Sequence, residues 1–591
     1  MTPRHKSFVI QYLIPGVLFI FLFLYFVIFN KYHILYLEQN QLFRFNLSYL
    51  RDFISLPGSL SLIIGAFLTQ FFIIPWLGAL IITLNCLALY FFAKYILGKY
   101  NIKGLIFPFI PVCLLVILHS NELFTTDQSV GLLLALLFTV FYISVGTPKI
   151  RYILFLTLWP LCFYLIGGFS MICVIICALN EILYQGGRRD RFLWIALYIV
   201  EGILVPWLFS RLLFYMPEDK IYTYPLFYTF HTFELVCLIS LYFILPLLMA
   251  MGYFINRAKI SAKKLISGRT IRILAGSLTI VLMVFVIYKY AYNSRAEKLF
   301  AIDYHIRQAE WKKALKQIEQ YPDLNTLVIY YTNLALLNSG QLGEKMFDYP
   351  QTGPGGLRLR WERNSNLFFG GEIFYYLGYN NEAYRWAFEA MVAKGLNPRS
   401  LKRLIITSIV NGENDVAEKY LHILGQAPFY RKWVLKYERL LSDPESQESD
   451  PEIKRNRDLL VTKNFISNAN GLNLDNLLEN HPENRMAFEY FLATLLLNKD
   501  LDFFAENIPR LKDFGYTAIP LYFEEALIFY NFYENKQIIP EGFSFRPETV
   551  ARFNEYAGIY TKFRSDRAVA RFELGKKFRN SYWYYLQFAI I

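Results

Sequence analysis

Charge is scarce in this sequence of 591 residues: only 18% of the side chains are Asp, Glu, Lys or Arg. A soluble domain carries about 25% charged residues. Hydrophobic residues make up 55% of the chain and aromatic residues 18%. This composition excludes a disordered or collagen-like chain. It indicates a membrane domain joined to an ordinary water-soluble region.

Cysteine is also rare, and its distribution is uneven. The sequence has six cysteines, and none of them lies beyond residue 237. The C-terminal half therefore contains no disulfide and is suited to an oxidising compartment, because nothing in it can misoxidise. All six lie in apolar runs, at Cys86, Cys113, Cys162, Cys173, Cys177 and Cys237.

The common catalytic signatures are absent. The sequence has no Walker A motif, no HExxH, no CxxC and no GxSxG. The motifs that carry ATP hydrolysis, zinc peptidase action and thiol redox chemistry are therefore absent. The seven histidines are scattered along the chain, with no pair at metal-ligand spacing.

Basic residues are concentrated in the apolar half. Residues 1–291 carry 22 Lys and Arg against 10 Asp and Glu, whereas residues 292–591 carry 38 against 37. A nucleic-acid-binding protein would place its basic patch on the water-soluble part. We therefore expect no nucleic acid among the partners and expect the lipid bilayer to be one.

Nine apolar runs approach the length of about 20 residues needed to cross a bilayer. Sixteen Lys and Arg fall in alternate loops that share the side of the N-terminus, and six fall on the other side, which places the N-terminus inside. An odd number of spans then puts the C-terminal half outside, in the periplasm of a bacterial inner membrane. The predicted spans are 8–30, 74–97, 104–119, 129–147, 152–167, 168–184, 192–213, 232–255 and 272–290.

Two of the predicted outside loops stand out. The first, 31–57, is long and aromatic, and we expect it and the short apolar segment 58–71 to lie along the membrane interface. The second, 119–128, contains Glu122 and Asp127 and no Lys or Arg.

The C-terminal half shows a repeat of paired amphipathic segments. Gly378 to Ala383 aligns with Gly412 to Ala417, which gives a spacing of 34 residues. This spacing and the small residues are typical of tetratricopeptide-like helical hairpins. We predict an all-α protein: a transmembrane bundle over 1–291 and a periplasmic α-solenoid that binds a protein or peptide. The solenoid comprises repeats over 292–442, a charged linker over 443–456 and degenerate repeats over 457–591.

The stretch from His119 to Val130, which runs into an apolar helix, resembles the second outside loop of the GT-C class of membrane glycosyltransferases. A GT-C core followed by such repeats is similar to the transmembrane-and-tetratricopeptide family of protein O-mannosyltransferases. The first loop lacks the paired acidic residues of that class. The resemblance implies transfer of a sugar from a polyprenyl-phosphate carrier to an envelope acceptor. The chain also looks like a polytopic membrane-protein family of Bacteroidota, a resemblance that implies no activity.

Glycosyl transfer needs a base for the acceptor proton and positive charge near the leaving phosphate. Glu38 or Asp52 could supply the base. The carrier phosphate could be bound by Arg44 and Arg51, because the guanidinium fork matches phosphate oxygens. Mg²⁺ or Mn²⁺ could be held by Glu122 and Asp127. The alternative is that all six are ordinary charges of solvated loops.

One further carboxylate lies inside a predicted span. Glu201 is near the middle of 192–213, where a charge costs at least a few kcal/mol. It is either a protonated structural residue or part of a polar cavity or proton path. Two other functions are therefore weighed: a non-catalytic scaffold that binds periplasmic proteins through its repeats, and a transporter.

Overall fold

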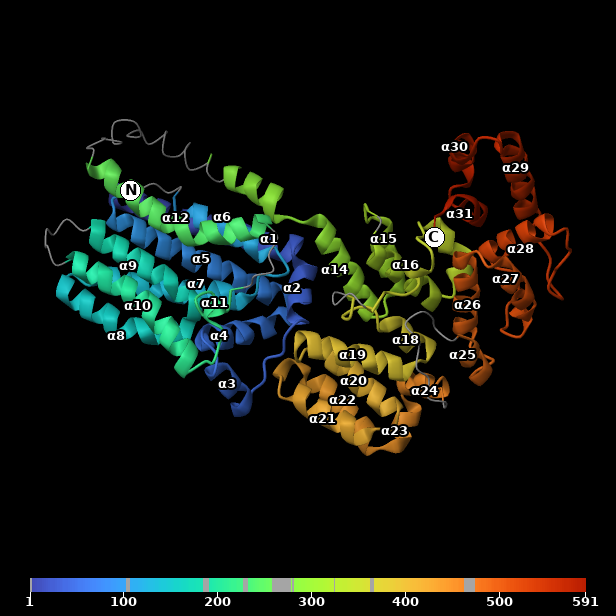
Figure 1. Cartoon of the computed structure of the whole chain (residues 1–591), viewed down its shortest axis with the longest axis horizontal. Helices are drawn as coiled ribbons and strands as arrows, with labels where there is room; N and C mark the ends of the chain where they lie inside the picture. Colours follow the sequence, from blue (N-terminus) through green and yellow to red (C-terminus); the bar gives the residue numbers. More distant parts are fainter. Residues whose placement is uncertain are drawn as a thin grey trace. The chain divides into compact units, whose positions relative to one another are not determined.

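The computed structural model describes residues 3–102, 107–183, 191–226, 232–257, 278, 281–323, 325–361, 366–461 and 474–590. The described part of the protein is all-helical: 77% of these residues are in helices and none is in a strand (Figure 1). The chain forms two compact units, and the division falls after Glu297. The first unit contains residues 1–297 and 426–429, and the second contains residues 298–425 and 430–591.

The first unit is a bundle of mostly apolar helices. Figure 1 shows its long helices α5, α7, α8, α9 and α10 running side by side. Proline starts two of them, α5 and α8, at a position where its missing N–H has no helical partner to lose. The helices are α1 Pro3–Phe29, α2 Lys31–Glu38, α3 Leu47–Ile54, α4 Ser59–Thr69, α5 Pro75–Lys99, α6 Phe109–His119, α7 Thr126–Ser144, α8 Pro148–Ile166, α9 Met171–Leu183, α10 Arg191–Leu212, α11 Glu218–Ile221 and α12 Thr232–Arg257.

Helix α4 packs inside this bundle against α7. Its buried positions are small residues, including Gly65 and Ala66. A Cβ atom at Gly65 would lie only 2.4 Å from the Cα atom of Asp127 on α7. The two backbones approach this closely because the α4 face is small, as is usual where helices pack within membranes. The segment expected to lie along the membrane interface is therefore part of the bundle.

Helices α8 and α9 form an antiparallel hairpin. Arg151 is in the first turn of α8 and Glu181 is near the end of α9, yet Arg151 Nε lies 2.8 Å from Glu181 Oε1. A continuous helix would separate two residues thirty positions apart by about 45 Å. The chain reverses at Gly167, whose φ of +67° is a backbone conformation that glycine adopts readily.

The ends of the helices gather in two groups within the first unit. At one end, which we call the first-loop end, the amide of Gly58 donates to Tyr164 O and the amide of Gly168 donates to Tyr224 O. At the opposite end, which we call the Arg151 end, the Tyr100 hydroxyl donates to Asn180 Oδ1 at 2.7 Å. Successive long helices thus run in alternating directions through the unit.

Several helices are long and apolar enough to cross a membrane. In the part of the chain that the structure describes, five apolar stretches meet that test by length and composition, or six if the bent pair α1 and α2 is one span. One of the five, Pro148–Leu183, is the α8–α9 hairpin described above. Helix α10 leaves most of its apolar side chains exposed, among them Val200 and Ile203 at 54% and 59%. An exposed apolar surface of this extent is compatible with a membrane protein.

The second unit consists of shorter helices. In the region of the predicted repeats, α19 packs on α20, α20 on α21 and α21 on α22. Ala383 and Ala417, the small residues of the repeat pattern, are both fully buried. The helices are α14 Ser294–Arg307, which spans the division between the units, α15 Trp311–Glu319, α16 Thr326–Asn338, α17 Leu342–Lys345, α18 Glu372–Leu377, α19 Asn380–Lys394, α20 Pro398–Val410, α21 Asn414–Gly425, α22 Arg431–Ser442, α23 Pro444–Ser449, α24 Pro451–Asp458, α25 Leu474–Asn480, α26 Arg485–Asn498, α27 Leu501–Asn507, α28 Leu521–Tyr533, α29 Pro547–Phe563, α30 Arg567–Phe578 and α31 Tyr582–Phe588.

The segment 443–456, interpreted above as a linker, differs from that interpretation. It forms α23 and the greater part of α24. Asp443 and Asp450 cap these two helices by accepting hydrogen bonds from backbone amides, and each Pro occupies a first-turn position that favours a helix start. Ile453 is fully buried. The charged residues of this segment therefore belong to two packed helices and do not form a linker.

Candidate functional site

The first loop contains two short helices, α2 and α3, which carry three of the predicted site residues, and Arg44 lies between them. The side chain of Asn46 starts α3 by accepting a hydrogen bond from the Ser48 amide at 2.9 Å, a typical N-cap. No residue of α3 is buried, and Leu47 is 85% exposed. Helix α3 therefore presents apolar and charged side chains together, as helices at a membrane interface do.

The arginines predicted to bind phosphate and the carboxylates predicted to act as the base lie in different surroundings within this loop. Arg51 and Asp52 are exposed on α3. Arg44 is partly buried, with its guanidinium 4.7 Å from the centre of the Tyr49 ring. Glu38 ends α2, is 3% exposed and accepts a hydrogen bond from the side chain of Gln39. Of the two predicted catalytic carboxylates, one is therefore buried and the other faces outward.

The two carboxylates of the second loop also differ. Glu122 is exposed in the turn between α6 and α7. Asp127 is 8% exposed in the first turn of α7, where it packs against α4. Within the described residues, no three His, Cys, Asp or Glu side chains are placed to hold a metal ion. The donor set expected for Mg²⁺ or Mn²⁺ is not assembled by Glu122 and Asp127 alone, so a cation at this position stays a prediction.

The first and second loops meet through a different set of residues, which we call the first-loop cluster: Tyr25, Asn30, His33, His119 and Ser120. The Tyr25 hydroxyl lies 3.1 Å from Ser120 Oγ. His33 lies near His119. All five side chains are more than nine-tenths buried.

Within this cluster, His119 has unused hydrogen-bonding capacity. Its Nε2 atom is buried and has no hydrogen-bond partner among the described residues. The ring contacts Phe124 edge-on at 4.9 Å, which holds its orientation. A neutral imidazole with a free ring nitrogen can accept or donate a hydrogen bond there. The sequence offered little signal for this cluster, because its two histidines are 86 positions apart.

Two carboxylates border the first-loop cluster. Glu234 on α12 accepts a hydrogen bond from Asn121 Nδ2 at 3.2 Å. Glu297 accepts hydrogen bonds from the amides of Tyr32 and His33 at 2.7 and 3.0 Å, and so caps the start of α2, where negative charge is favourable. Burial raises the pKa of Glu297 to about 7, although these amides lower it in part. Glu297 therefore fixes the helix that carries His33.

The Arg151 end holds a second buried polar group, whose function is structural. Arg151 binds Glu181 through two hydrogen bonds of 2.8 and 3.0 Å, and Tyr142 and Asn180 donate to the same carboxylate. These donors compensate a charge that would be costly in the bundle. Glu201, on α10, is half-buried, and its Oε2 atom has no hydrogen-bond partner among the described residues.

The comparisons with known proteins give a family. The sequence pattern of a family of unknown function, DUF6057, matches residues 6–589. The chain belongs to the DUF6057 family. No curated protein and no solved structure matches it. Because the DUF6057 match runs through both units, the apolar bundle and the helical second unit belong together in this family.

Proposed function

We propose that the protein is a glycosyltransferase of the membrane's outer face that takes a sugar from a polyprenyl-phosphate carrier and transfers it to an envelope acceptor. The observation that carries this proposal is the first-loop cluster. Residues of two loops, far apart in the sequence, meet there as a buried group that can transfer protons. The amphipathic helix α3 lies in the same loop as His33, where a lipid-linked substrate would arrive.

The proposed topology has nine spans with the N-terminus inside and the second unit in the periplasm. Its support is the sorting of helix ends into the first-loop end and the Arg151 end, which alternating spans require. Basic residues such as Lys99 and Lys149 occupy the Arg151 end, the side expected to be cytoplasmic. The second unit would then be an α-solenoid of tetratricopeptide-like hairpins that selects or presents the acceptor.

The transfer forms a bond between the acceptor oxygen and the anomeric carbon and breaks the bond from that carbon to the carrier phosphate. A base takes the acceptor proton. We assign this step to His119, whose Nε2 has no other partner among the described residues, with Glu38 and Asp52 as the carboxylates predicted from the sequence. Arg51, exposed on α3 beside apolar side chains, would bind the departing phosphate at the level of the lipid headgroups. No step is assigned to a metal ion.

The test uses a deletion strain complemented with wild-type protein, with His119→Gln or with His422→Gln at matched membrane protein level. His422 is an exposed histidine of the second unit and serves as the control. The readout is mass spectrometry of envelope glycans and glycoproteins. We expect wild type and His422→Gln to restore a sugar that is missing in the deletion strain, and His119→Gln not to restore it.

Other results would change the assignment. Full restoration by His119→Gln would remove His119 from the reaction. An unchanged glycan profile in the deletion strain would refute the transferase proposal. In that case, a defect caused by deleting 298–591 would favour a scaffold that binds periplasmic proteins, and loss of a proton-coupled flux in Glu201→Gln would favour a transporter.

A further inference from the structure

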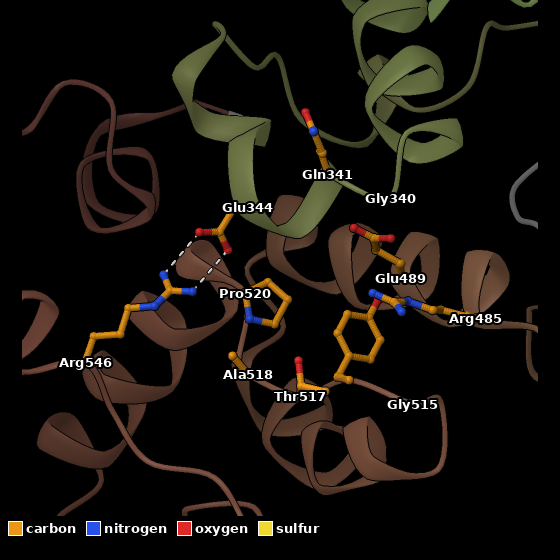
Figure 2. Close-up of a pocket in the computed structure, with 11 residues that line it drawn as sticks. Gly340, Gln341, Glu344, Arg485, Glu489, Gly515, Thr517, Ala518, Pro520 and Arg546 are labelled. Atoms are coloured by element: carbon orange, nitrogen blue, oxygen red, sulfur yellow. Dashed lines mark hydrogen bonds and ion pairs between the residues drawn. The ribbon is translucent and has the colours of Figure 1, made fainter.

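The second unit contains a polar pocket of about 240 Å³. Four separate segments form its walls: the turn and short helix at 340–344, the start of α26, the loop 515–520, and Arg546 before α29 (Figure 2). Most ligand pockets are larger than this. The volume suits a ligand the size of one sugar ring or one amino-acid residue.

On one wall of the pocket, the charged side chains already form ion pairs and hydrogen bonds with other residues of the protein. Arg546 Nη1 lies 3.2 Å from Glu344 Oε1, and Figure 2 shows this pair facing one another. Arg546 also lies 3.5 Å from Glu524 and donates to Ile519 O. Glu344 accepts a hydrogen bond from the Leu521 amide at 2.7 Å, at the start of α28. These contacts join two helices and leave little capacity for a ligand.

The opposite wall has polar side chains that can bind a ligand. The Arg485 guanidinium lies 4.0 Å from the centre of the Tyr516 ring and forms no ion pair in the part of the chain that the structure describes. The Tyr516 side chain is 9% exposed, and its buried hydroxyl lies beside Arg485 and Glu489. A ligand hydroxyl in the pocket can both donate to and accept from this group of side chains.

Glu489 lies on the same wall. It is 2% exposed, and its Oε1 atom accepts a hydrogen bond from the Gly343 amide at 2.9 Å. Burial raises the pKa of Glu489, while the Gly343 amide and the charge of Arg485 lower it in part. Carboxylate, guanidinium and phenol groups thus border one small space. A ligand in the pocket would meet both hydrogen-bond donors and hydrogen-bond acceptors.

The charges of the lining balance, with Glu344 and Glu489 against Arg485 and Arg546. A phosphate or an ammonium ion would bring an unbalanced charge, whereas a hydroxyl both donates and accepts hydrogen bonds and matches such a lining. A peptide would need an extended groove rather than a pocket closed by four segments. We propose that this pocket binds one sugar residue of a neutral carbohydrate.

This inference rests on the pocket alone and is independent of the transfer reaction. The protein would hold a glycan on its second unit whether or not the first-loop cluster is catalytic. If the protein is a transferase, the pocket is a place where an acceptor glycan is recognised. The binding test therefore omits any lipid-linked donor, so that its failure would not count against the proposed reaction.

The test measures binding by full-length protein in detergent, using saturation-transfer NMR with a panel of methyl glycosides of glucose, mannose, galactose, N-acetylglucosamine and N-acetylgalactosamine. The main variant is Tyr516→Phe, which removes only the hydroxyl and keeps the aromatic ring against Arg485. Tyr560→Phe, on α29 outside the pocket, is the matched control. We expect at least one glycoside to bind at millimolar concentration.

We expect Tyr516→Phe to weaken that binding about three- to tenfold, the effect of one neutral hydrogen bond, and Tyr560→Phe to leave it unchanged. Glu489→Gln should weaken it further, because hydrogen bonds to charged groups are stronger. The proposal is overturned if no glycoside binds, or if Tyr516→Phe binds as well as wild type. Binding of a short peptide but of no glycoside, with the same loss in Tyr516→Phe, would replace it with a peptide site.

Discussion

The buried ion pair between Arg151 and Glu181 gives a quantitative test of how the bundle is built. The two side chains are 3% and 1% exposed and are joined by two hydrogen bonds. Replacing Arg151 by Met leaves the Glu181 carboxylate buried without its counter-ion, and replacing Glu181 by Met leaves the guanidinium in the same position. Loss of one partner of a buried pair costs about 3–5 kcal/mol.

The double variant should be far less damaged than the sum of the singles. With both charges gone, no buried charge remains, and exchange of a buried pair for apolar residues is often neutral. The Tyr142 and Asn180 donors lose their acceptor, which costs about 1 kcal/mol each. We therefore expect the double variant to lose about 2 kcal/mol, so that the coupling energy between the two sites is about 4 kcal/mol or more.

The measurement is the free energy of unfolding of the full chain in mixed micelles, titrated with denaturing detergent. Arg211→Gln, which removes an exposed pair with Glu218, is the control and should cost less than about 1 kcal/mol. Single variants that each cost less than about 1 kcal/mol, or costs that simply add in the double variant, would refute the α8–α9 hairpin packing, because only a chain reversal at Gly167 brings these residues together.

Two further predictions concern α4 and Glu297. Gly65→Ala should lower the free energy of unfolding by about 1–3 kcal/mol, because its Cβ would meet the Asp127 backbone at 2.4 Å. Gly98→Ala, with no atom within 4 Å, should not lower it, and equal effects would contradict the α4–α7 packing. Burial raises the pKa of Glu297 from 4.5 to about 7, so the folded state binds this proton more tightly than the unfolded chain does. Glu297 should therefore make stability fall by up to about 3 kcal/mol as pH rises from 4.5 to 7, and denaturation measured across that range should show a smaller fall in Glu297→Gln than in wild type.

Much of the local structure could be predicted from the sequence. Among the described residues, the apolar runs fall in helices of the first unit, and the break at Gly167-Gly168 marks the turn of the α8–α9 hairpin. Most of the predicted span 272–290 lies outside the described residues, and the number of nine spans stays a prediction. Hydrophobic periodicity and glycine placement are local signals, so they appear in one sequence. The helical character of the second unit follows from the same signals. The segment 443–456 was misjudged because its charge and prolines suggested a linker, although Asp-Pro pairs also start helices.

The candidate site was harder to predict. Charge in an apolar chain singles out the acidic residues of the outside loops, yet Glu122 and Asp52 are exposed while Asp127 packs against a helix. The sequence does not predict the first-loop cluster, because His33 and His119 lie on different helices. Glu181 lies near a helix end, where water would be expected to reach it, but its burial depends on Arg151.

The sequence by itself determined that this is a helical chain with an apolar, basic first half and a near-neutral second half, because composition and periodicity are properties of short segments. Tertiary structure alone decided which polar side chains share a buried space: Tyr25 with Ser120, Arg151 with Glu181, and Tyr516 with Glu489 in the pocket. The physical reason is that a polar group is tolerated in the interior only where helix packing supplies its partner, and packing joins residues that lie far apart along the chain.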